Sequence, residues 1–347
     1  MKYVNVLLIF VPVSIVAAFL HWDERLIFFS SALGIVPLAW TLGRATEELA
    51  AHTGPRVGGL LNATLGNSAE LIITIFAIRE GLLELVKASI TGSILGNILL
   101  ILGLSILVGG VRNGLQRFDR GQAGLSATMM TLAIIALLIP SIFGHAIEIQ
   151  DQAAVEWLSL GVAAVMIAIY VLSLAYSFLS ARDESLAEEH GVAMWSVRKA
   201  IIILVIATLF VAWLSEILVS AVEPVTESVG ITEFFLGVIM IPLVGNVAEH
   251  LVAVQASWKN KMDLSLAVSL GSSMQIALFV APLLVFISLA MGNPLTLIFN
   301  QFELLALGAG VGIAALISLD GESNWLEGAQ LLSVYVIVAL AFFFLPT

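Results

Sequence analysis

Two copies of one five-residue motif place a glutamate inside long apolar runs. GNSAE covers residues 66–70, and GNVAE covers residues 245–249. An ionised carboxylate in an apolar core is costly unless it holds a proton or a cation. No lysine or arginine lies near Glu70 or Glu249 in the middle of these runs. Two carboxylates that alternate between protons and a cation would suit proton-coupled cation transport.

The neighbours of each glutamate supply oxygen atoms and space. Asn67 and Asn246 precede the glutamates by three residues, so on a helix each amide shares a face with a carboxylate. Gly66 and Gly245 carry no side chain, which lets backbones approach closely and lets carbonyls reach an ion. Pro242 removes a helical hydrogen bond before the second motif and is expected to free a carbonyl there. The adjacent apolar runs add neutral oxygens, from Ser93, Ser272, Gln275 and Asn97.

This donor set favours a hard divalent cation. The chain has no cysteine, so no thiolate ligand is available, and the candidate donors around the two glutamates are oxygen atoms. Ca²⁺ accepts about 6–8 oxygens in flexible geometry, whereas Mg²⁺ needs a tighter octahedron. The residue types therefore favour Ca²⁺, with Mn²⁺ as a possible second substrate. We expect Ca²⁺ and H⁺ to be transported ions, with no cofactor, no catalytic residues and no enzyme activity.

The composition predicts an all-α integral membrane protein. Of 347 residues, 60 % are hydrophobic and only 11 % are charged, against roughly 25 % charged in soluble domains. The apolar runs are continuous rather than alternating, which excludes a β-barrel. The expected partners are the bilayer and the two ions, not nucleic acid. The oligomeric state is left open.

Breaks in hydropathy divide the chain into about eleven membrane spans. The spans are predicted at 4–20, 25–51, 57–79, 83–110, 119–142, 153–181, 197–222, 232–257, 263–291, 295–319 and 325–345. The first is interpreted as a helix rather than a signal peptide. Glu70 is predicted near the centre of the third span and Glu249 just past the centre of the eighth.

The positive charges predict an orientation. Eleven of the fourteen Lys and Arg residues fall on the side of the N-terminus, which places that terminus in the cytoplasm and the C-terminus outside. The acidic connector 182–196 would then be cytoplasmic, either as a solvated linker or as a region that collects cations. Short loops favour a prokaryotic inner membrane over a vacuolar one.

An offset of 179 residues superimposes the two motifs and also aligns Gly92–Ser93 with Gly271–Ser272. Five predicted spans, an odd number, separate equivalent positions, so the two halves are expected to be inverted in the membrane. We predict a single transmembrane domain with a first helix (1–24), repeat 1 (25–181) and repeat 2 (197–347). Inverted repeats are typical of secondary transporters with a site near the midplane.

The two repeat segments resemble the α-repeats of the cation/proton exchanger family of Ca²⁺/H⁺ antiporters. The resemblance is carried by GNxAE in both copies and by GSSMQIALFV at 271–280. It implies that Glu70 and Glu249 ligate Ca²⁺, with support from Asn67 and Asn246. It also implies that the carbonyls of the motif glycines contribute, that Ser93, Ser272 and Gln275 line the cavity, and that spans two and seven move.

Several alternatives remain. Na⁺/Ca²⁺ exchangers have a similar fold but usually carry Ser and Pro around the glutamate, so Asn67 and Ala69 here favour protons. A hydrolase is disfavoured because no His-Glu-x-x-His motif is present, and a channel because the carboxylate site is duplicated and inverted. His250 is either a proton relay, since imidazole titrates near neutral pH, or a core residue. Glu216 is a candidate for the access path, and Glu303 is unexplained by the site.

Overall fold

The computed structural model describes residues 4–148, 152–180 and 193–345, most of which are helical. The predicted acidic connector 182–196 lies outside the described residues except for 193–196. The chain forms two compact units. Unit 1 is drawn from Met1–Glu80, Ala168–Gly230 and Val244–Ala248, and unit 2 from Gly81–Ile167, Ile231–Leu243 and Glu249–Thr347. Each unit therefore takes residues from both halves of the chain.

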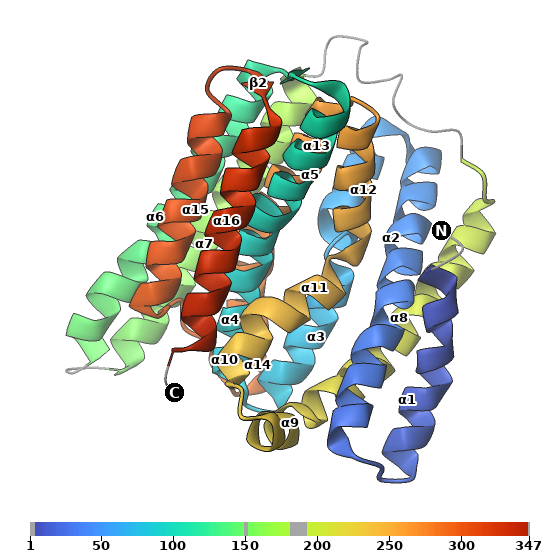
Figure 1. Ribbon diagram of the computed structural model, residues 1–347. Coiled ribbons are helices and arrows are strands. Elements are labelled where there is room, and N and C mark those ends of the chain that lie inside the picture. The colour runs from blue at the N-terminus through green and yellow to red at the C-terminus, as the bar shows by residue number, and fades with distance from the viewer. Residues whose placement is uncertain (1–3, 149–151, 181–192, 346–347) are drawn as a thin grey trace. The chain divides into compact units, whose positions relative to one another are not determined.

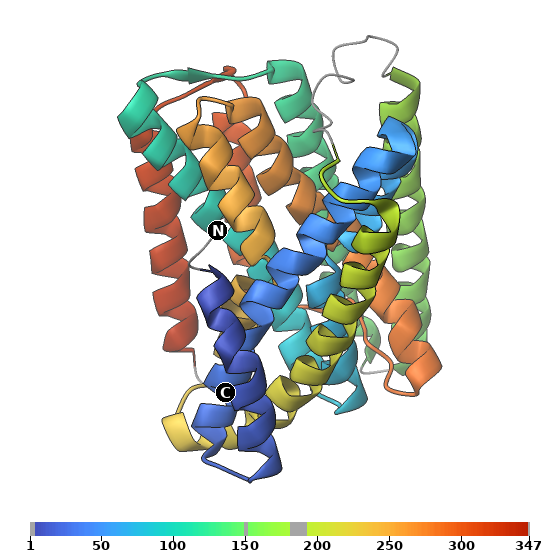
Figure 2. The same cartoon turned by 90° about the vertical axis from the view of Figure 1, so that its right-hand side faces the viewer.

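Unit 1 is organised around the long helix α2 (Glu24–Leu65), which packs along α8 (Val197–Ser220) and α1 (Phe10–Phe19), as Figure 2 shows. The interface contains buried apolar side chains at helical spacing, including Phe28, Ile35 and Leu42 of α2 and Val211, Leu214 and Leu218 of α8. The remaining elements are the 3₁₀ turn η1 (Val4–Ile9), α3 (Ser68–Arg79) and α9 (Val222–Val229).

Helix α2 bends sharply near the predicted boundary between spans two and three. A Cβ atom built on Gly58 would lie 2.7 Å from the carbonyl oxygen of Ala50. Eight residues of straight helix would separate these positions by about 12 Å. The predicted ends of the two spans, at 51 and 57, therefore mark a bend in one helical run rather than a loop.

Unit 2 contains two long spans that run in opposite directions, as the positions of α4 and α5 relative to α13 and α14 show in Figure 1. The first joins α4 (Leu83–Leu95), the π-helical turn η2 (Gly96–Ile101) and α5 (Leu102–Asn113). The second joins α13 (Met262–Gln275), the π-helical turn η5 (Ile276–Val280) and α14 (Ala281–Met291).

Other elements surround these two spans. They are α6 (Arg120–Glu148), α10 (Glu233–Phe235), the π-helical turn η4 (Leu236–Met240), α15 (Gln301–Ile317) and α16 (Trp325–Phe343). Helices α11 (Ile241–Gly245) and α12 (Val247–Trp258) contribute to both units. Helix α7 (Gln152–Ser180) contributes to both units. Strand β1 (Gln116–Arg117) pairs antiparallel with β2 (Glu322–Ser323).

Secondary structure recurs at the offset found in the sequence. Helices α3 and α12 begin and end at positions that differ by 179 residues. Within unit 2, the hydroxyl of Ser273 lies 3.5 Å from the carbonyl oxygen of Ile94, its own counterpart at that offset. Residues contact their own symmetry mates only near a two-fold axis. Such an approximate axis therefore relates the two long spans of unit 2.

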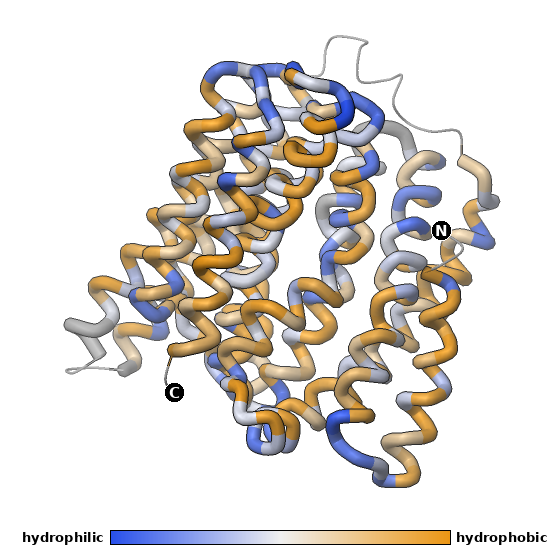
Figure 3. The backbone as a smooth tube through the Cα atoms, viewed as in Figure 1, coloured by the Kyte–Doolittle hydropathy of each residue, from blue (hydrophilic) through white to orange (hydrophobic). Residues whose placement is uncertain are grey.

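Long apolar helices support the predicted membrane class. Among the described residues, seven helices are long and apolar enough to cross a membrane, or eight if the pair bent by 115° at Val222–Gly245 is one span. Val4–Phe19 and Gln301–Ile317 are apolar but shorter, so the count of eleven stays a prediction. In Figure 3, apolar residues follow the lengths of α15 and α16, while hydrophilic residues gather at the turn that joins them.

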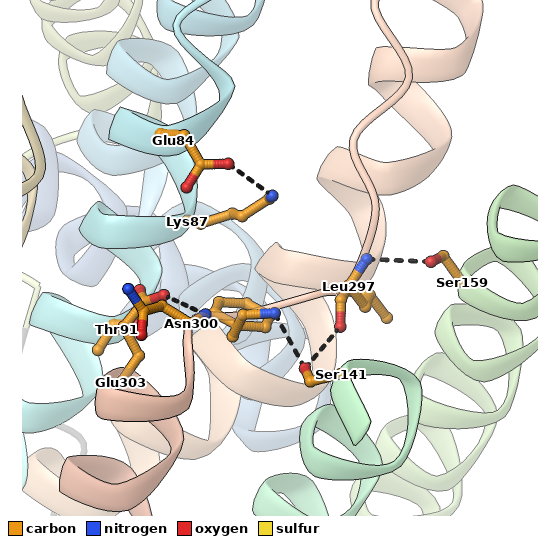
Figure 4. Close-up of polar contacts among 9 residues, drawn as sticks. Glu84, Lys87, Thr91, Ser141, Ser159, Leu297, Asn300 and Glu303 are labelled. Atoms are coloured by element: carbon orange, nitrogen blue, oxygen red, sulfur yellow. Dashed lines mark hydrogen bonds and ion pairs between the residues drawn. The ribbon is translucent and has the colours of Figure 1, made fainter. Parts of the chain in front are cut away.

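The tenth predicted span, 295–319, is wrong at its start. Helix α15 begins only at Gln301, after a buried extended segment. The N–H groups of Leu295, Leu297 and Phe299 donate to serine hydroxyls, those of Ser288, Ser159 and Ser141 at 2.8, 3.0 and 2.9 Å. Figure 4 shows the side chains of Ser141 and Ser159 next to this segment, each joined to it by a dashed line. Non-helical backbone is tolerated in a membrane protein where protein groups satisfy it in this way.

Ser141→Ala is expected to destabilise the fold. It removes the acceptor of the Phe299 N–H, and leaving a buried donor unsatisfied costs about 1–3 kcal/mol. The measurement is thermal unfolding of the purified protein in detergent. Ser333→Ala is the control, because the Ser333 hydroxyl is exposed and donates to the Ala329 carbonyl of its own helix. Equal melting temperatures for the two variants would contradict this account of the segment.

Candidate functional site

The first motif lies at a helix break in unit 1. Helix α2 ends at Leu65 and α3 begins at Ser68, with Asn67 in a non-helical conformation. The predicted span 57–79 is therefore interrupted as a helix, and Glu70 lies in the first turn of α3. Its side chain is buried, with 3 % exposure. The first turn of a helix offers N–H groups and a positive dipole end, which favour a carboxylate.

The second motif repeats this geometry. Helix α11 ends at Gly245 and α12 begins at Val247, so the predicted span 232–257 is also interrupted. Glu249 lies in the first turn of α12 and is partly buried, while Asn246 is buried at the break. From the sequence alone, irregular backbone is expected only beside Pro242. The Gly-Asn dipeptide present in both copies is a helix-end signal that would have indicated both breaks.

Within unit 1, the backbone of the second motif lies against the glutamate of the first. A Cβ atom built on Gly245 would lie 2.5 Å from Cγ and 3.4 Å from Cδ of Glu70. Non-bonded carbons normally stay about 3.5–4 Å apart. A glycine at position 245 therefore allows a contact that no other residue would allow, and Gly245 confines the side chain of Glu70.

The neutral candidates on α4, η2 and α13 lie in unit 2. Ser93, Ser272 and Asn97 are buried, and Gln275 is partly buried. Asn97 belongs to the π-helical turn η2, and π-turns occur frequently at functional sites. Its Nδ2 atom, with the residue 1 % exposed, has no hydrogen-bond partner among the described residues. Because buried polar groups are nearly always satisfied, Asn97 is a good candidate to meet water or an ion.

The segment before the second motif is held closely on α4, inside unit 2. Pro242 has no N–H to donate to the carbonyl of Val238, four residues earlier. This carbonyl lies so close to Gly92 that a Cβ atom there would overlap it. A Cβ atom on Gly237 would likewise lie 2.6 Å from Cβ of Ala88. The Val238 carbonyl, which Pro242 was expected to leave without its helical hydrogen bond, thus lies against α4.

The two candidates for proton relay or access differ in their surroundings. His250 is buried on α12, and its Nε2 atom has no hydrogen-bond partner among the described residues. Glu216 lies on α8 in unit 1, where it forms an ion pair with Arg79 at 3.3 Å, and both side chains are more than half exposed. Exposed pairs of this kind contribute little to stability.

The described residues contain no cluster of three or more His, Asp or Glu side chains arranged to hold a metal ion. A cation bound at either motif would therefore need neutral oxygens in addition to carboxylates. Carbonyls at the end of one half-helix and amides at the break are of this type.

Comparison with known proteins agrees with the resemblance seen in the motifs. The chain is 46 % identical to a Ca²⁺/H⁺ antiporter of Aphanothece halophytica, over 98 % of this chain and 96 % of that protein. It is 42 % identical to the Ca²⁺/H⁺ antiporter ChaA of Bacillus subtilis, over 96 % of this chain and 97 % of that protein. It is 37 % identical to a vacuolar calcium ion transporter of Schizosaccharomyces pombe, over 99 % of this chain and 85 % of that protein.

Solved structures show the same fold. Native YfkE superimposes with a TM-score of 0.87 at 41 % identity, covering 99 % of this chain and all of that one. The H⁺/Ca²⁺ exchanger CAX superimposes with a TM-score of 0.79, covering 99 % of this chain and 91 % of that one. Its sequence identity is 17 %, so it supports the fold alone. The profile of the sodium/calcium exchanger proteins matches residues 25–179 and 199–344. This chain is thus a multi-pass integral membrane protein that belongs to the sodium/calcium exchanger protein family.

Proposed function

We propose that this protein is a secondary transporter that exchanges Ca²⁺ for H⁺. The observation that carries the proposal is the buried glutamate of one motif, Glu70, held against the glycine backbone of the other, Gly245. Relatives named as Ca²⁺/H⁺ antiporters, which align over nearly the whole chain, support the choice of ions.

The proposed mechanism is competition for two carboxylates. In one orientation Ca²⁺ displaces protons from Glu70 and Glu249, and in the other protons displace Ca²⁺. If these groups carry all the coupling, two protons exchange for each Ca²⁺. The empty, doubly ionised site does not cross, because two uncompensated charges in a dry core are prohibitive. This enforces exchange and prevents leak.

The helix breaks suit this competition. The first turns of α3 and α12 favour the ionised carboxylate through their N–H groups and dipoles. The preceding half-helices end in carbonyl groups that can face a cation. We propose that the carbonyls of Gly66 and Gly245 and the amides of Asn67 and Asn246 complete the ligand set. The further lining residues are Ser93, Ser272, Gln275 and Asn97.

The access route and the orientation are also proposals. By resemblance, α2 and α8 move to alternate access, and both belong to unit 1. His250, present in only one motif copy, is proposed to relay protons, and Glu216 to border the access path. The repeats are assigned to 25–181 and 197–347, around the connector 182–196. With the N-terminus in the cytoplasm of a prokaryotic cell, the proton gradient would drive Ca²⁺ export.

Flux in proteoliposomes tests this proposal directly. Purified protein should take up ⁴⁵Ca²⁺ when the lumen is acidic, because protons leaving the lumen drive Ca²⁺ inward. Nigericin, which dissipates the pH gradient in K⁺ medium, should stop the uptake. A Na⁺ gradient of equal size is the comparison. Uptake driven by Na⁺ and not by protons would instead establish a Na⁺/Ca²⁺ exchanger, for which Asn67 and Ala69 replace the expected Ser and Pro.

A further inference from the structure

Glu303 is a buried carboxylate that the two motifs do not use. It lies in the first turn of α15 in unit 2 and is 1 % exposed. Its Oε1 accepts a hydrogen bond from the Thr91 hydroxyl of α4 at 2.7 Å, and its Oε2 accepts one from the Asn300 N–H at 2.8 Å. Figure 4 shows the three residues together. Both carboxylate oxygens thus accept a hydrogen bond, as they do in an ionised carboxylate.

The charged groups nearby are on α4 itself. Lys87 lies one turn before Thr91 and pairs with Glu84 at 2.8 Å (Figure 4). Both act on Glu303 electrostatically, with opposite signs. The Lys87–Glu84 pair therefore adds little net charge at Glu303, and the two hydrogen bonds are the specific contacts that fix its carboxylate.

Helix α15 packs beside the span of α4 and η2 at a second point, in addition to the Glu303–Thr91 hydrogen bond. Seven residues after Glu303, a Cβ atom built on Gly310 would lie 3.2 Å from Cδ1 of Ile98, which itself lies seven residues after Thr91. The same separation along both segments means that α15 runs parallel to α4 and η2. The Glu303–Thr91 hydrogen bond fixes the register of this packed pair at its N-terminal end.

The turn of α4 that Glu303 holds also holds the segment before the second motif. Gly92 follows Thr91 directly, and its backbone packs on the Val238 carbonyl with no space for a Cβ atom. A shift of α4 at this turn must therefore move Val238, and with it the chain that passes through Pro242 into GNVAE. The path from Glu303 to the second motif consists of one hydrogen bond and one backbone contact.

The Glu303–Thr91 hydrogen bond has no equivalent at the positions that the approximate two-fold axis relates to it. At the offset of 179 residues, the counterpart of Thr91 is Leu270 and the counterpart of Glu303 is Gly124. Neither counterpart can form a charge-assisted hydrogen bond. The Glu303–Thr91 pair is therefore not required by the repeat architecture.

We propose that Glu303 is a positioning residue, which holds Thr91 and, through Gly92 and Val238, sets the position of the second motif. This inference rests on the proposed Ca²⁺/H⁺ exchange, because it assigns the motif as part of the ion site. In this role Glu303 acts through its hydrogen bonds and carries no transported proton. Its loss raises the Ca²⁺ concentration needed for half-maximal transport.

The test compares variants in proteoliposomes under a fixed pH gradient. Glu303→Gln removes the charge from this contact, because its amide nitrogen cannot accept from the Thr91 hydroxyl and can only donate a neutral hydrogen bond to it. Thr91→Val has nearly the same shape and leaves the cap of α15 intact. Each should raise KM for Ca²⁺ roughly tenfold, the effect of one lost charge-assisted hydrogen bond. The double variant should be no worse than either single variant, because both remove the same interaction.

Two controls separate positioning from general stability. Thr91→Ser keeps the hydroxyl and should keep KM near the wild-type value. Glu327→Gln removes the same type of capping box, between Asn324 and Glu327 of α16, where the described structure shows no bond to α4. It should also leave KM unchanged. Ca²⁺-dependent thermal stabilisation of each purified variant gives a second measure of affinity that needs no transport.

Three results would overturn the inference. The first is an unchanged KM and unchanged Ca²⁺ stabilisation in folded Glu303→Gln and Thr91→Val. The second is a KM increase of equal size in Glu327→Gln. The third is a changed number of protons per Ca²⁺ in Glu303→Gln, which would make Glu303 a proton carrier. A wild-type protein with no flux driven by the pH gradient would contradict the proposed function instead, and the Ca²⁺ stabilisation would still test the positioning role.

Discussion

Glu70→Gln is expected to abolish Ca²⁺ uptake driven by a pH gradient, and Glu249→Gln should do the same. Glutamine has the size of glutamate but can neither bind nor release a proton in the working pH range. It also removes one of the two negative charges that would neutralise Ca²⁺. If the two carboxylates are the shared site, each substitution removes both the ion ligand and half of the coupling.

The measurement is initial ⁴⁵Ca²⁺ uptake into proteoliposomes at matched protein content. The loss should exceed about a hundredfold, because removing one partner of a buried charge interaction typically costs about 3–5 kcal/mol. Glu80→Gln is the matched control, since Glu80 follows α3 directly but is exposed to solvent. Wild-type transport by Glu70→Gln would eliminate the shared-site mechanism, whatever the behaviour of Glu249→Gln.

The sequence predicted the membrane class and most of the long helices because hydropathy determines both. The runs at 83–110, 119–142, 153–181, 197–222, 263–291 and 325–345 correspond to helical spans in the described structure. Hydropathy does not register where a helix breaks, however. The break at Asn67 falls inside a run that is apolar on both sides, so the pattern predicted one continuous helix.

The extended segment before α15 shows a second limit. Leu295, Leu297 and Phe299 are as apolar as any membrane helix requires. Their N–H groups are satisfied by hydroxyls that are as far as 158 positions away in the sequence. No local pattern contains this information, because an apolar side chain does not indicate the partner of its own backbone.

For the site, the sequence predicted the types of chemical group, while the structure supplies their surroundings. The duplicated motif was enough to select Glu70 and Glu249 as candidate ligands. The contact between Glu70 and Gly245 joins residues from the two motif copies, and only a folded chain shows it. Glu303 has a local signal in the sequence, since Asn300-x-x-Glu303 has the form of a capping box. Its bond to Thr91, in contrast, depends on the packing of α15 on α4.

The contact at Gly245 leads to the second large expected effect. Gly245→Ala would place a methyl group 2.5 Å from Cγ of Glu70, about 1 Å inside normal contact distance. The overlapping atom is Cγ, near the root of the buried Glu70 side chain, so moving only the far end of that side chain cannot relieve the overlap. Either the carboxylate of Glu70 rotates away or the break before α12 shifts. Both responses separate the proposed ion ligands, so we expect KM for Ca²⁺ to rise by roughly tenfold to a hundredfold.

Gly161→Ala is the control for Gly245→Ala, because a Cβ atom built on Gly161 in α7 meets nothing within 4 Å. There the change should leave transport intact and favour the helix by about 1 kcal/mol. Unchanged KM in Gly245→Ala would show that the carboxylate of Glu70 works without confinement by the second motif. A raised KM at a normal melting temperature would show the opposite. Gly245 would then have two roles. It would leave space for the side chain of Glu70, and its carbonyl would be available to an ion.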